Sequence, residues 1–440
     1  MGSIRRRLSQ ADGGPKTVIA TLSVRLLGRG LALLQAIVLA RILGVEQFGI
    51  FTLAIAWTVV LHSIAVLGFD GLQARSVSIY EARGEAALLR GLLRRCDEIT
   101  LLAAGATAGL GAVGAIIAVD PDYLAAILIG LPLVPLRSLT LLRQGALRGL
   151  HRAELSLSPT LVVYPGVLSL AALGFDLAGI ELDARWAVAL ACLGAAAALA
   201  FSIAARHRHL ALQIPAAEPR FSTREWLVAT RPFAISGVIR AGTASVGLIA
   251  LGVIGSAADA GELRVLLRGA ELIGIVLAAV NTPLGPLIAR HQALDEDASM
   301  RTAIRRGART SLALSLPLGL ALLLFSDQLF ALFGDGFVGN RGVFAVLIVG
   351  SLFNAAIGPS MQVHLMTGEG AIAVRFTAVA LALDLALCLA LIPPFGLYGA
   401  AIAWSADLIL ANSLLAIHAW QRLAINLTPF GPLQRHPAEP

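Results

Sequence analysis

The sequence is dominated by long apolar stretches, and its arginines are concentrated in every second connection between them. Twelve such stretches begin at roughly residues 17, 50, 99, 123, 156, 186, 231, 262, 307, 341, 371 and 398. Of the 34 Lys+Arg, 25 fall in the N-terminus, the C-terminus and alternate loops. The intervening loops hold four, namely Arg41, Arg185, Arg264 and Arg341. Because short arginine-rich loops stay cytoplasmic, the pattern predicts a polytopic membrane protein with both termini in the cytosol.

Composition supports this class of protein and argues against others. Hydrophobic residues make up 57% of the chain and charged residues 14%, which is far from the balance of a soluble domain. The net charge of +7 lies in short loops beside apolar spans, so it indicates membrane topology and not a nucleic-acid partner. The three cysteines are far apart and predict neither disulfides nor a metal site.

Weak internal similarity indicates that the chain is duplicated. LGVEQFG (43–49) follows the first span and IGSAADAG (254–261) follows the seventh, while LRQGALRG (142–149) and VHLMTGEG (363–370) end the fourth and tenth. The longest basic, proline-containing polar stretch lies between the two copies. We therefore expect a cytoplasmic tail (1–16), a six-helix bundle (17–204), a cytoplasmic linker (205–230), a second six-helix bundle (231–420) and a cytoplasmic tail (421–440).

The predicted fold is an all-α membrane protein of twelve transmembrane helices in two bundles. Each half has an even number of spans, so both copies insert with the same orientation. They are then expected to be related by a pseudo-twofold axis along the membrane normal, with a central cavity between them.

Arginines inside the apolar spans are the main candidates for function, because a charge in the hydrocarbon layer costs about 2.5–3.5 kcal/mol. Arg25 and Arg29 share one face of the first span, and Arg240 lies at a comparable depth on the seventh. Arg268 lies on the eighth span. These four are predicted to bind an anionic substrate, because a guanidinium forms bidentate hydrogen bonds with phosphate. Arg137, Arg143 and Glu271 are candidates for a secondary cavity.

A structural interpretation of the same arginines stays open. Each could be paired with an acid, extend to the membrane interface or hold helices together. For Arg268, Glu271 follows three residues later on the same helix and could neutralise it.

Two acidic residues lie within the last two spans. Asp384 and Asp407 could take up a proton or a sodium ion and couple it to a conformational change. The alternative is a salt bridge to a cavity arginine or a structural hydrogen bond. The sequence contains no nucleotide-binding motif, catalytic constellation or metal-ligand spacing, so we expect no cofactor or metal. The energy would then come from an ion gradient, such as one of protons or sodium ions, from the membrane potential or from a substrate gradient.

Three segments resemble a known family. VLARILGVEQFGIFTLAIA (38–56) and LGFDGLQARSVSIYEARGE (67–85) are similar to the opening of Wzx-like polysaccharide-export flippases of the MOP superfamily, and GLIALGVIGSAADAGELRVLLRGAELIG (247–274) resembles the repeat of that signature. The resemblance implies alternating access and a cationic cavity lined by the first, second, seventh and eighth spans. Of these, the second span contributes His62 and no arginine.

The substrate implied by this resemblance is an oligosaccharide on undecaprenyl diphosphate, moved from the inner to the outer leaflet of the bacterial inner membrane. Expected partners are this lipid-linked oligosaccharide, membrane lipids, a polysaccharide polymerase and glycosyltransferases of O-antigen or exopolysaccharide synthesis. Three alternatives stay open. One is an ion-coupled exporter of cationic drugs, which should carry acids in its cavity. The others are a lipid II flippase of the same superfamily and a membrane enzyme, although the predicted external loops are short for an active site.

Overall fold

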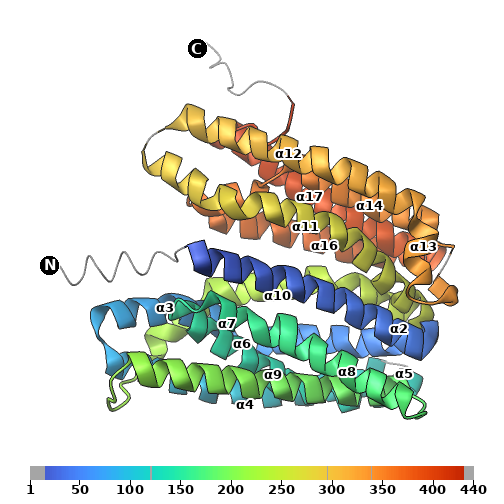
Figure 1. The fold of residues 1–440 in the computed structure, drawn as a ribbon, viewed down its shortest axis with the longest axis horizontal. Helices are drawn as coiled ribbons and strands as arrows, with labels where there is room; N and C mark the ends of the chain where they lie inside the picture. Colours follow the sequence, from blue (N-terminus) through green and yellow to red (C-terminus); the bar gives the residue numbers. More distant parts are fainter. Residues whose placement is uncertain (1–14, 119–120, 295, 338, 431–440) are drawn as a thin grey trace. The chain divides into compact units, whose positions relative to one another are not determined.

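The computed structural model describes residues 15–118, 121–294, 296–337 and 339–430. Within these ranges the regular secondary structure is entirely helical (Figure 1). The chain divides into two compact units, residues 1–241 and 242–440, and the division falls inside a single long helix, α10 (Thr223–Ile254).

The first unit contains the helices up to the first part of α10. In chain order these are α2 (Pro15–Ala65), α3 (Phe69–Arg83), α4 (Ala86–Ala118), α5 (Pro121–Gly130), α6 (Leu133–Gly149), α7 (Ala153–Ser158), the π-helical turn η1 (Pro159–Val163), α8 (Tyr164–Leu177) and α9 (Ala184–Gln213). The second unit continues with α11 (Ala257–Ala293), α12 (Asp297–Leu324), α13 (Ser326–Ala331), the 3-10 turn η2 (Asp335–Phe337), α14 (Arg341–Ile357), α15 (Ser360–Met366), α16 (Gly370–Phe395) and α17 (Leu397–Arg422).

A single glycine divides α2 into two spans. Gly44 has φ 70° and ψ 176°, a conformation that only glycine adopts readily, so the helix is interrupted there. The chain turns back at this point. The first part of α2 runs towards one end of the unit, and the second part returns towards the other end, where α3 begins (Figure 1). The first two predicted spans, starting at 17 and 50, are the two parts of α2.

The lengths and apolar character of the helices confirm an all-α, multi-pass membrane protein. Ten helical segments of the described chain are long and apolar enough to cross a membrane. The first of them, Ser23–Ala65, has 43 residues and is divided at Gly44. Together with α11, which has 37 residues, they account for the twelve predicted spans. The axis and the cavity between the two bundles stay predictions.

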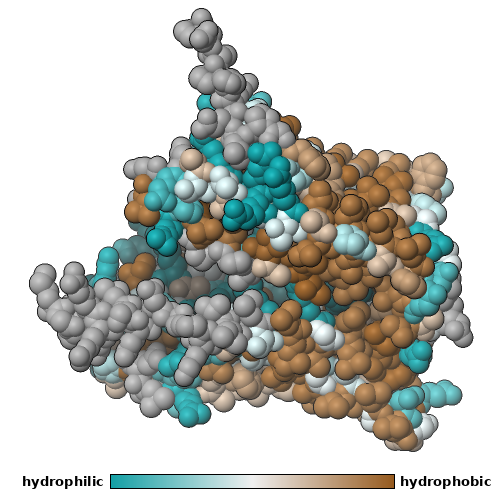
Figure 2. Space-filling model, turned by 45° about the horizontal axis from the view of Figure 1, so that its top comes forward, coloured by the Kyte–Doolittle hydropathy of each residue, from teal (hydrophilic) through white to brown (hydrophobic). Residues whose placement is uncertain are grey.

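Large apolar side chains lie on the outside of these helices. Leu102 and Ile117 on α4 are 76% and 79% exposed, and Leu177 at the end of α8 is 86% exposed. Hydrophobic residues cover much of the surface visible in Figure 2, and hydrophilic residues gather towards its edges. A lipid environment explains this distribution, because these side chains would be costly to expose to water.

Small residues bring the helices of each unit into close contact. In the first unit, a Cβ on Gly145 of α6 would lie 2.3 Å from the carbonyl oxygen of Asp70 on α3. In the second, a Cβ on Gly350 of α14 would lie 2.9 Å from the side chain of Ser405 on α17. Such close approach is typical of helix packing in membranes, where van der Waals contact replaces the hydrophobic effect between helices.

The predicted linker is helical at both of its ends. Only residues 214–222 lie outside helices, and they are attached to the first unit. The Arg220 amide donates to the Ala87 carbonyl (2.9 Å), and Arg90 Nε donates to the Pro215 carbonyl (3.1 Å). Trp226, at the start of α10, is buried and donates from Nε1 to the Tyr80 hydroxyl (3.0 Å). The expected domain limits, including both tails, stay a prediction, and residues 1–14 and 431–440 lie outside the described part of the chain.

Candidate functional site

The first unit contains a cluster of basic side chains on three different helices. His62 lies on α2, Arg137 on α6 and Arg240 on α10, and both arginines are close enough to His62 to interact with it electrostatically. The Ser138 hydroxyl donates to the His62 carbonyl (3.4 Å), which holds α6 against α2 beside Arg137. We call His62, Arg137 and Arg240 the basic cluster. The sequence had not linked Arg137 and His62 to Arg240, because these residues are far apart along the chain.

The basic cluster has no acidic partner among the described residues. Neither Arg137 nor Arg240 forms an ion pair there. Instead, the Arg137 guanidinium lies over the Tyr164 ring at 4.7 Å from its centroid, and His62 Nδ1 is buried without a hydrogen-bond partner within the described chain. Arg240 is exposed although its helix is apolar. Because a guanidinium is costly in hydrocarbon, we expect this face of α10 to line water.

Arg25 and Arg29 lie on the first part of α2 and are both exposed. Arg25 forms no ion pair within the described residues, and its predicted role in substrate binding stays a prediction. Between them Gly28 allows α2 to approach the π-helical turn, since a Cβ there would lie 2.5 Å from the Leu161 Cβ. A larger residue at position 28 would therefore displace the two arginines.

Arg268 belongs to the second unit and is paired. Its Nη1 lies 2.8 Å from Glu271 Oε2, and Arg264 lies 3.8 Å from the other oxygen of the same carboxylate. This geometry therefore favours a structural role for Arg268, as a cation neutralised by Glu271. Its predicted role in substrate binding, and that of Glu271 in a secondary cavity, stay predictions.

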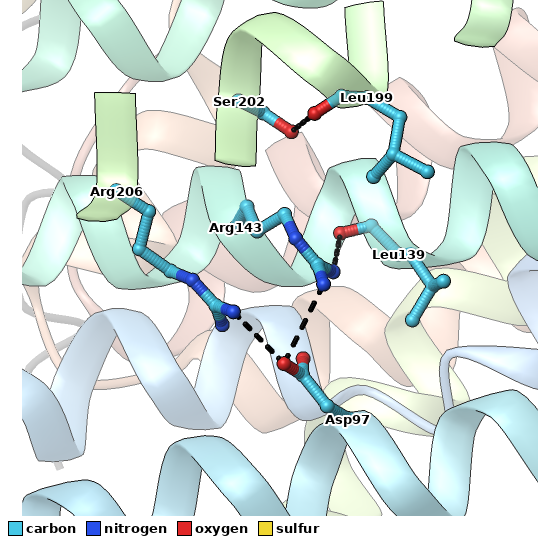
Figure 3. Close-up of polar contacts among 6 residues, drawn as sticks. All are labelled: Asp97, Leu139, Arg143, Leu199, Ser202 and Arg206. Atoms are coloured by element: carbon cyan, nitrogen blue, oxygen red, sulfur yellow. Dashed lines mark hydrogen bonds and ion pairs between the residues drawn. The ribbon is translucent and has the colours of Figure 1, made fainter. Parts of the chain in front are cut away.

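Arg143 is also paired, with an acid that the sequence analysis had not singled out. Asp97 on α4 forms ion pairs with Arg143 on α6 (Nη2–Oδ2, 3.5 Å) and with Arg206 on α9 (Nη2–Oδ2, 2.9 Å) (Figure 3). Arg143 is buried and also donates to the Leu139 carbonyl (2.8 Å). The three helices α4, α6 and α9 are thus held together by one carboxylate and two guanidinium groups. Asp97 lies just before the third apolar stretch, and its position at the end of a span was the only signal in the sequence.

The two acids of the second unit are buried. Asp384 on α16 is 1% exposed and Asp407 on α17 is 2% exposed, and they are close enough for Asp384 to affect Asp407 electrostatically. Asp384 Oδ1 lies 3.7 Å from the Cys388 thiol, while Asp407 Oδ1 has no hydrogen-bond partner within the described chain. Neither carboxylate is paired with an arginine among the described residues. Two neighbouring unneutralised carboxylates favour a proton or a bound cation.

Comparison with known families identifies the chain. Residues 16–292 match the family described as polysaccharide biosynthesis protein. The chain belongs to this family. The matching region includes the basic cluster, both arginines of α2 and Arg268, while Asp384 and Asp407 lie beyond it. No curated protein sequence matches this member of the polysaccharide biosynthesis family.

Solved structures of MOP-superfamily transporters share the fold of this family member. The lipid II flippase MurJ, in an inward closed conformation, has a TM-score of 0.69 at 13% identity, over 92% of this chain and 87% of the other. The MATE multidrug transporter DinF-BH in complex with R6G has a TM-score of 0.63 at 16% identity, over 94% and 97%. A MOP-superfamily transporter from Pyrococcus furiosus, whose binding pocket is described as reversed in polarity, has a TM-score of 0.58 at 14% identity, over 92% and 93%. At these identities the likeness concerns the fold alone, and it supports the predicted all-α, multi-pass architecture.

Proposed function

We propose that this protein is a flippase that moves an oligosaccharide linked to undecaprenyl diphosphate from the inner to the outer leaflet of the bacterial cytoplasmic membrane. Both termini then face the cytosol, as the distribution of arginines predicts. Transport proceeds by alternating access, with the sugar and diphosphate in a basic cavity and the lipid chain in the membrane. Glycosyltransferases would supply the substrate, and a polymerase would use the product.

The basic cluster is the observation that carries this proposal. Arg137 and Arg240 have no carboxylate partner among the described residues, so the positive charge is available to an anion. A diphosphate offers several acceptor oxygens, and guanidinium groups bind such oxygens with paired, charge-assisted hydrogen bonds. Arg25 and Arg29 provide a second pair of guanidinium groups on one helix face. An acidic sugar would be held by the same chemistry.

We further propose that ion coupling takes place in the second unit. Asp384 and Asp407 are both buried, and neither forms an ion pair with an arginine within the described part of the chain. Binding a proton or a sodium ion would remove the repulsion between them, so the conformation that binds the ion best would be favoured when the gradient is present. The gradient, and not a cofactor, would then provide the energy for transport.

A reconstituted assay tests the function directly. Purified protein in liposomes is supplied with a fluorescent oligosaccharide on undecaprenyl diphosphate, and its movement between leaflets is followed by protection from a membrane-impermeant sugar-oxidising reagent. We expect transport of this substrate and competition by lipids with a diphosphate head group. Lipids with an uncharged head group should not compete. If no diphosphate-linked sugar moves under an imposed proton or sodium gradient, the proposal is refuted.

The buried acids favour one alternative, an ion-coupled exporter of cationic compounds. The same liposomes loaded with an organic cation distinguish the two functions. Export of the cation without movement of the lipid-linked sugar would support the exporter. Selective movement of lipid II would instead support a lipid II flippase.

A further inference from the structure

Two histidines of the second unit form a direct hydrogen bond. His364 on α15 is completely buried, and its Nε2 lies 3.2 Å from Nδ1 of His418 on α17. The ring centroids are 5.3 Å apart. His418 is only partly buried, so the pair reaches from the interior of the unit to its surface. Helix α16 separates the two residues along the chain, so no local pattern in the sequence predicts this contact.

A second hydrogen bond fixes which nitrogen of each ring carries hydrogen. His364 Nδ1 lies 2.8 Å from the Ser360 carbonyl oxygen, which can only accept. His364 Nδ1 therefore donates, and Nε2 of neutral His364 accepts. The bond between the rings must then be donated by His418 Nδ1. This leaves Nε2 of His418 as the nitrogen that can take an additional proton.

The residues around Ser360 keep this arrangement in place. The Ser360 hydroxyl donates to Asn412 Oδ1 on α17 (2.6 Å), and Asn412 Nδ2 donates to Asn354 Oδ1 on α14 (3.0 Å). Helix α15 is thus attached to α17 at two points, by Ser360 and by His364. Rotation of the His364 imidazole would break both of its hydrogen bonds, the one to the Ser360 carbonyl and the one to His418.

An aromatic ring and an acidic group lie beside the pair. Phe376 on α16 lies edge-to-face with the His418 ring, at 5.8 Å between centroids. Glu369, in the turn before α16, is the acidic group close enough to act on His364. The like charges nearest along α16 and α17 are Arg375 and Arg422, and both are exposed to solvent screening.

Helix α11 is the remaining neighbour of α15, and its described titratable groups closest in sequence to the contact are either exposed or paired. Helix α11 approaches α15 at Gly285, where a Cβ would lie 2.4 Å from Gln362 Nε2. The described titratable groups that follow on α11 are Arg290, which is exposed, and His291, which is paired with Glu296 at 2.7 Å. Among the described groups, Glu369 is thus the acid that acts on His364, and Phe376 is the ring that lies against His418.

We propose that the His364–His418 pair is a proton-binding site that takes up one proton and then holds α15 more firmly against α17. The proton enters at Nε2 of His418, and the ring that carries it becomes a charged donor, which makes a stronger hydrogen bond than a neutral one. A second proton would need Nε2 of His364, which would remove the acceptor and place two positive charges side by side. This site is distinct from Asp384 and Asp407 and does not depend on which substrate the protein transports.

Nitrogen NMR of the intact protein tests the proposal. The chain has eight histidines, so protein labelled with ¹⁵N-histidine and reconstituted in lipid bilayers gives few signals. We expect a correlation between His364 Nε2 and His418 Nδ1, because hydrogen-bonded nitrogens are coupled through the shared hydrogen. As the pH falls, His418 should become doubly protonated while His364 keeps its single hydrogen on Nδ1. Together the two histidines should take up one proton.

Matched variants assign the signals and provide the control. His418→Gln should remove the correlation and the uptake of one proton, and His364→Gln should also remove the correlation. His207, which is exposed at the end of α9, is the control, and His207→Gln should remove only its own signal. Two protons taken up independently by His364 and His418 in the wild-type protein, or no correlation between them at any pH, would overturn the proposal even if the variants do not fold.

Discussion

The two units share a helical, membrane-spanning architecture but differ in the sign of their unneutralised charges. The first unit carries the basic cluster of His62, Arg137 and Arg240, which has no acidic partner among the described residues. The second unit carries Asp384 and Asp407, buried side chains that have no arginine partner there. The two units therefore differ in the chemistry that their unpaired side chains can offer. The proposed function requires this difference, because an anionic substrate and a coupling cation need sites of opposite charge.

The paired charges of the two units differ as well. In the first unit Asp97 joins Arg143 and Arg206 across three helices. In the second, Glu271 pairs with Arg264 and Arg268 from the same helix. The former join three helices, whereas the latter lie within α11. Mutations at each type of position test the contrast.

The largest effect is expected at the basic cluster. Arg240→Ala removes a guanidinium that binds the substrate anion in the proposed function. A hydrogen bond to a charged group contributes about 1.5–3 kcal/mol, so transport in the liposome assay should fall at least tenfold. Arg231→Ala on the same helix is the matched control and should retain normal transport, since Arg231 is exposed outside the cluster. Equal transport by both variants would remove the basic cluster from the substrate site.

The acids of the second unit are expected to control the response to a gradient. Asp384→Asn and Asp407→Asn each remove a carboxylate that would bind the coupling ion. In either variant, transport driven by an imposed proton or sodium gradient should drop to the rate measured without a gradient. Exchange of substrate in the absence of a gradient should persist, because the basic cluster is intact. A variant that still responds fully to the gradient would place ion coupling elsewhere.

The ion pairs of Asp97 with Arg143 and Arg206, here called the Asp97 triad, should affect stability more than transport. Asp97→Asn leaves the buried Arg143 without its counter-ion, and a hydrogen bond to a charged group contributes about 1.5–3 kcal/mol. We therefore expect a lower midpoint of thermal unfolding in detergent, with transport per folded molecule within twofold of wild type. Glu98→Gln, which removes only the surface pairs of Glu98 with Arg94 and Arg95, should change the midpoint little. A triad variant that is stable but inactive would show that Asp97 takes part in transport.

The smallest effect is expected at Arg268. Its pair with Glu271 is partly exposed, with side chains 22% and 46% accessible, so Arg268→Gln should cost about 0.2–1 kcal/mol in stability. Transport should change less than it does for Arg240→Ala in the same liposomes. A loss as large as that of Arg240→Ala would restore Arg268 to the substrate site and would show that both units carry substrate-binding cations.

Much of the fold could be predicted because membrane spans are specified by local composition. About 20 apolar residues cross the hydrocarbon layer whatever their neighbours are, so each span could be recognised from its own sequence. The position at which α2 is divided follows from Gly44, which lies within one of the segments that resemble the family signature. The helical extent of residues 205–213 and 223–230 could not be predicted from polarity, since surface helices are also polar.

The amino-acid sequence by itself determined the membrane class, the number of spans and the charged residues inside them, because hydrophobicity and charge are properties of individual residues. It also indicated the pairing of Arg268 with Glu271, because residues three apart are neighbours on any helix. Only the tertiary structure decided that Asp97 neutralises Arg143, that His62 lies near Arg137 and Arg240, and that His364 meets His418. These contacts join helices that are distant along the chain, and their geometry is set by how the helices pack.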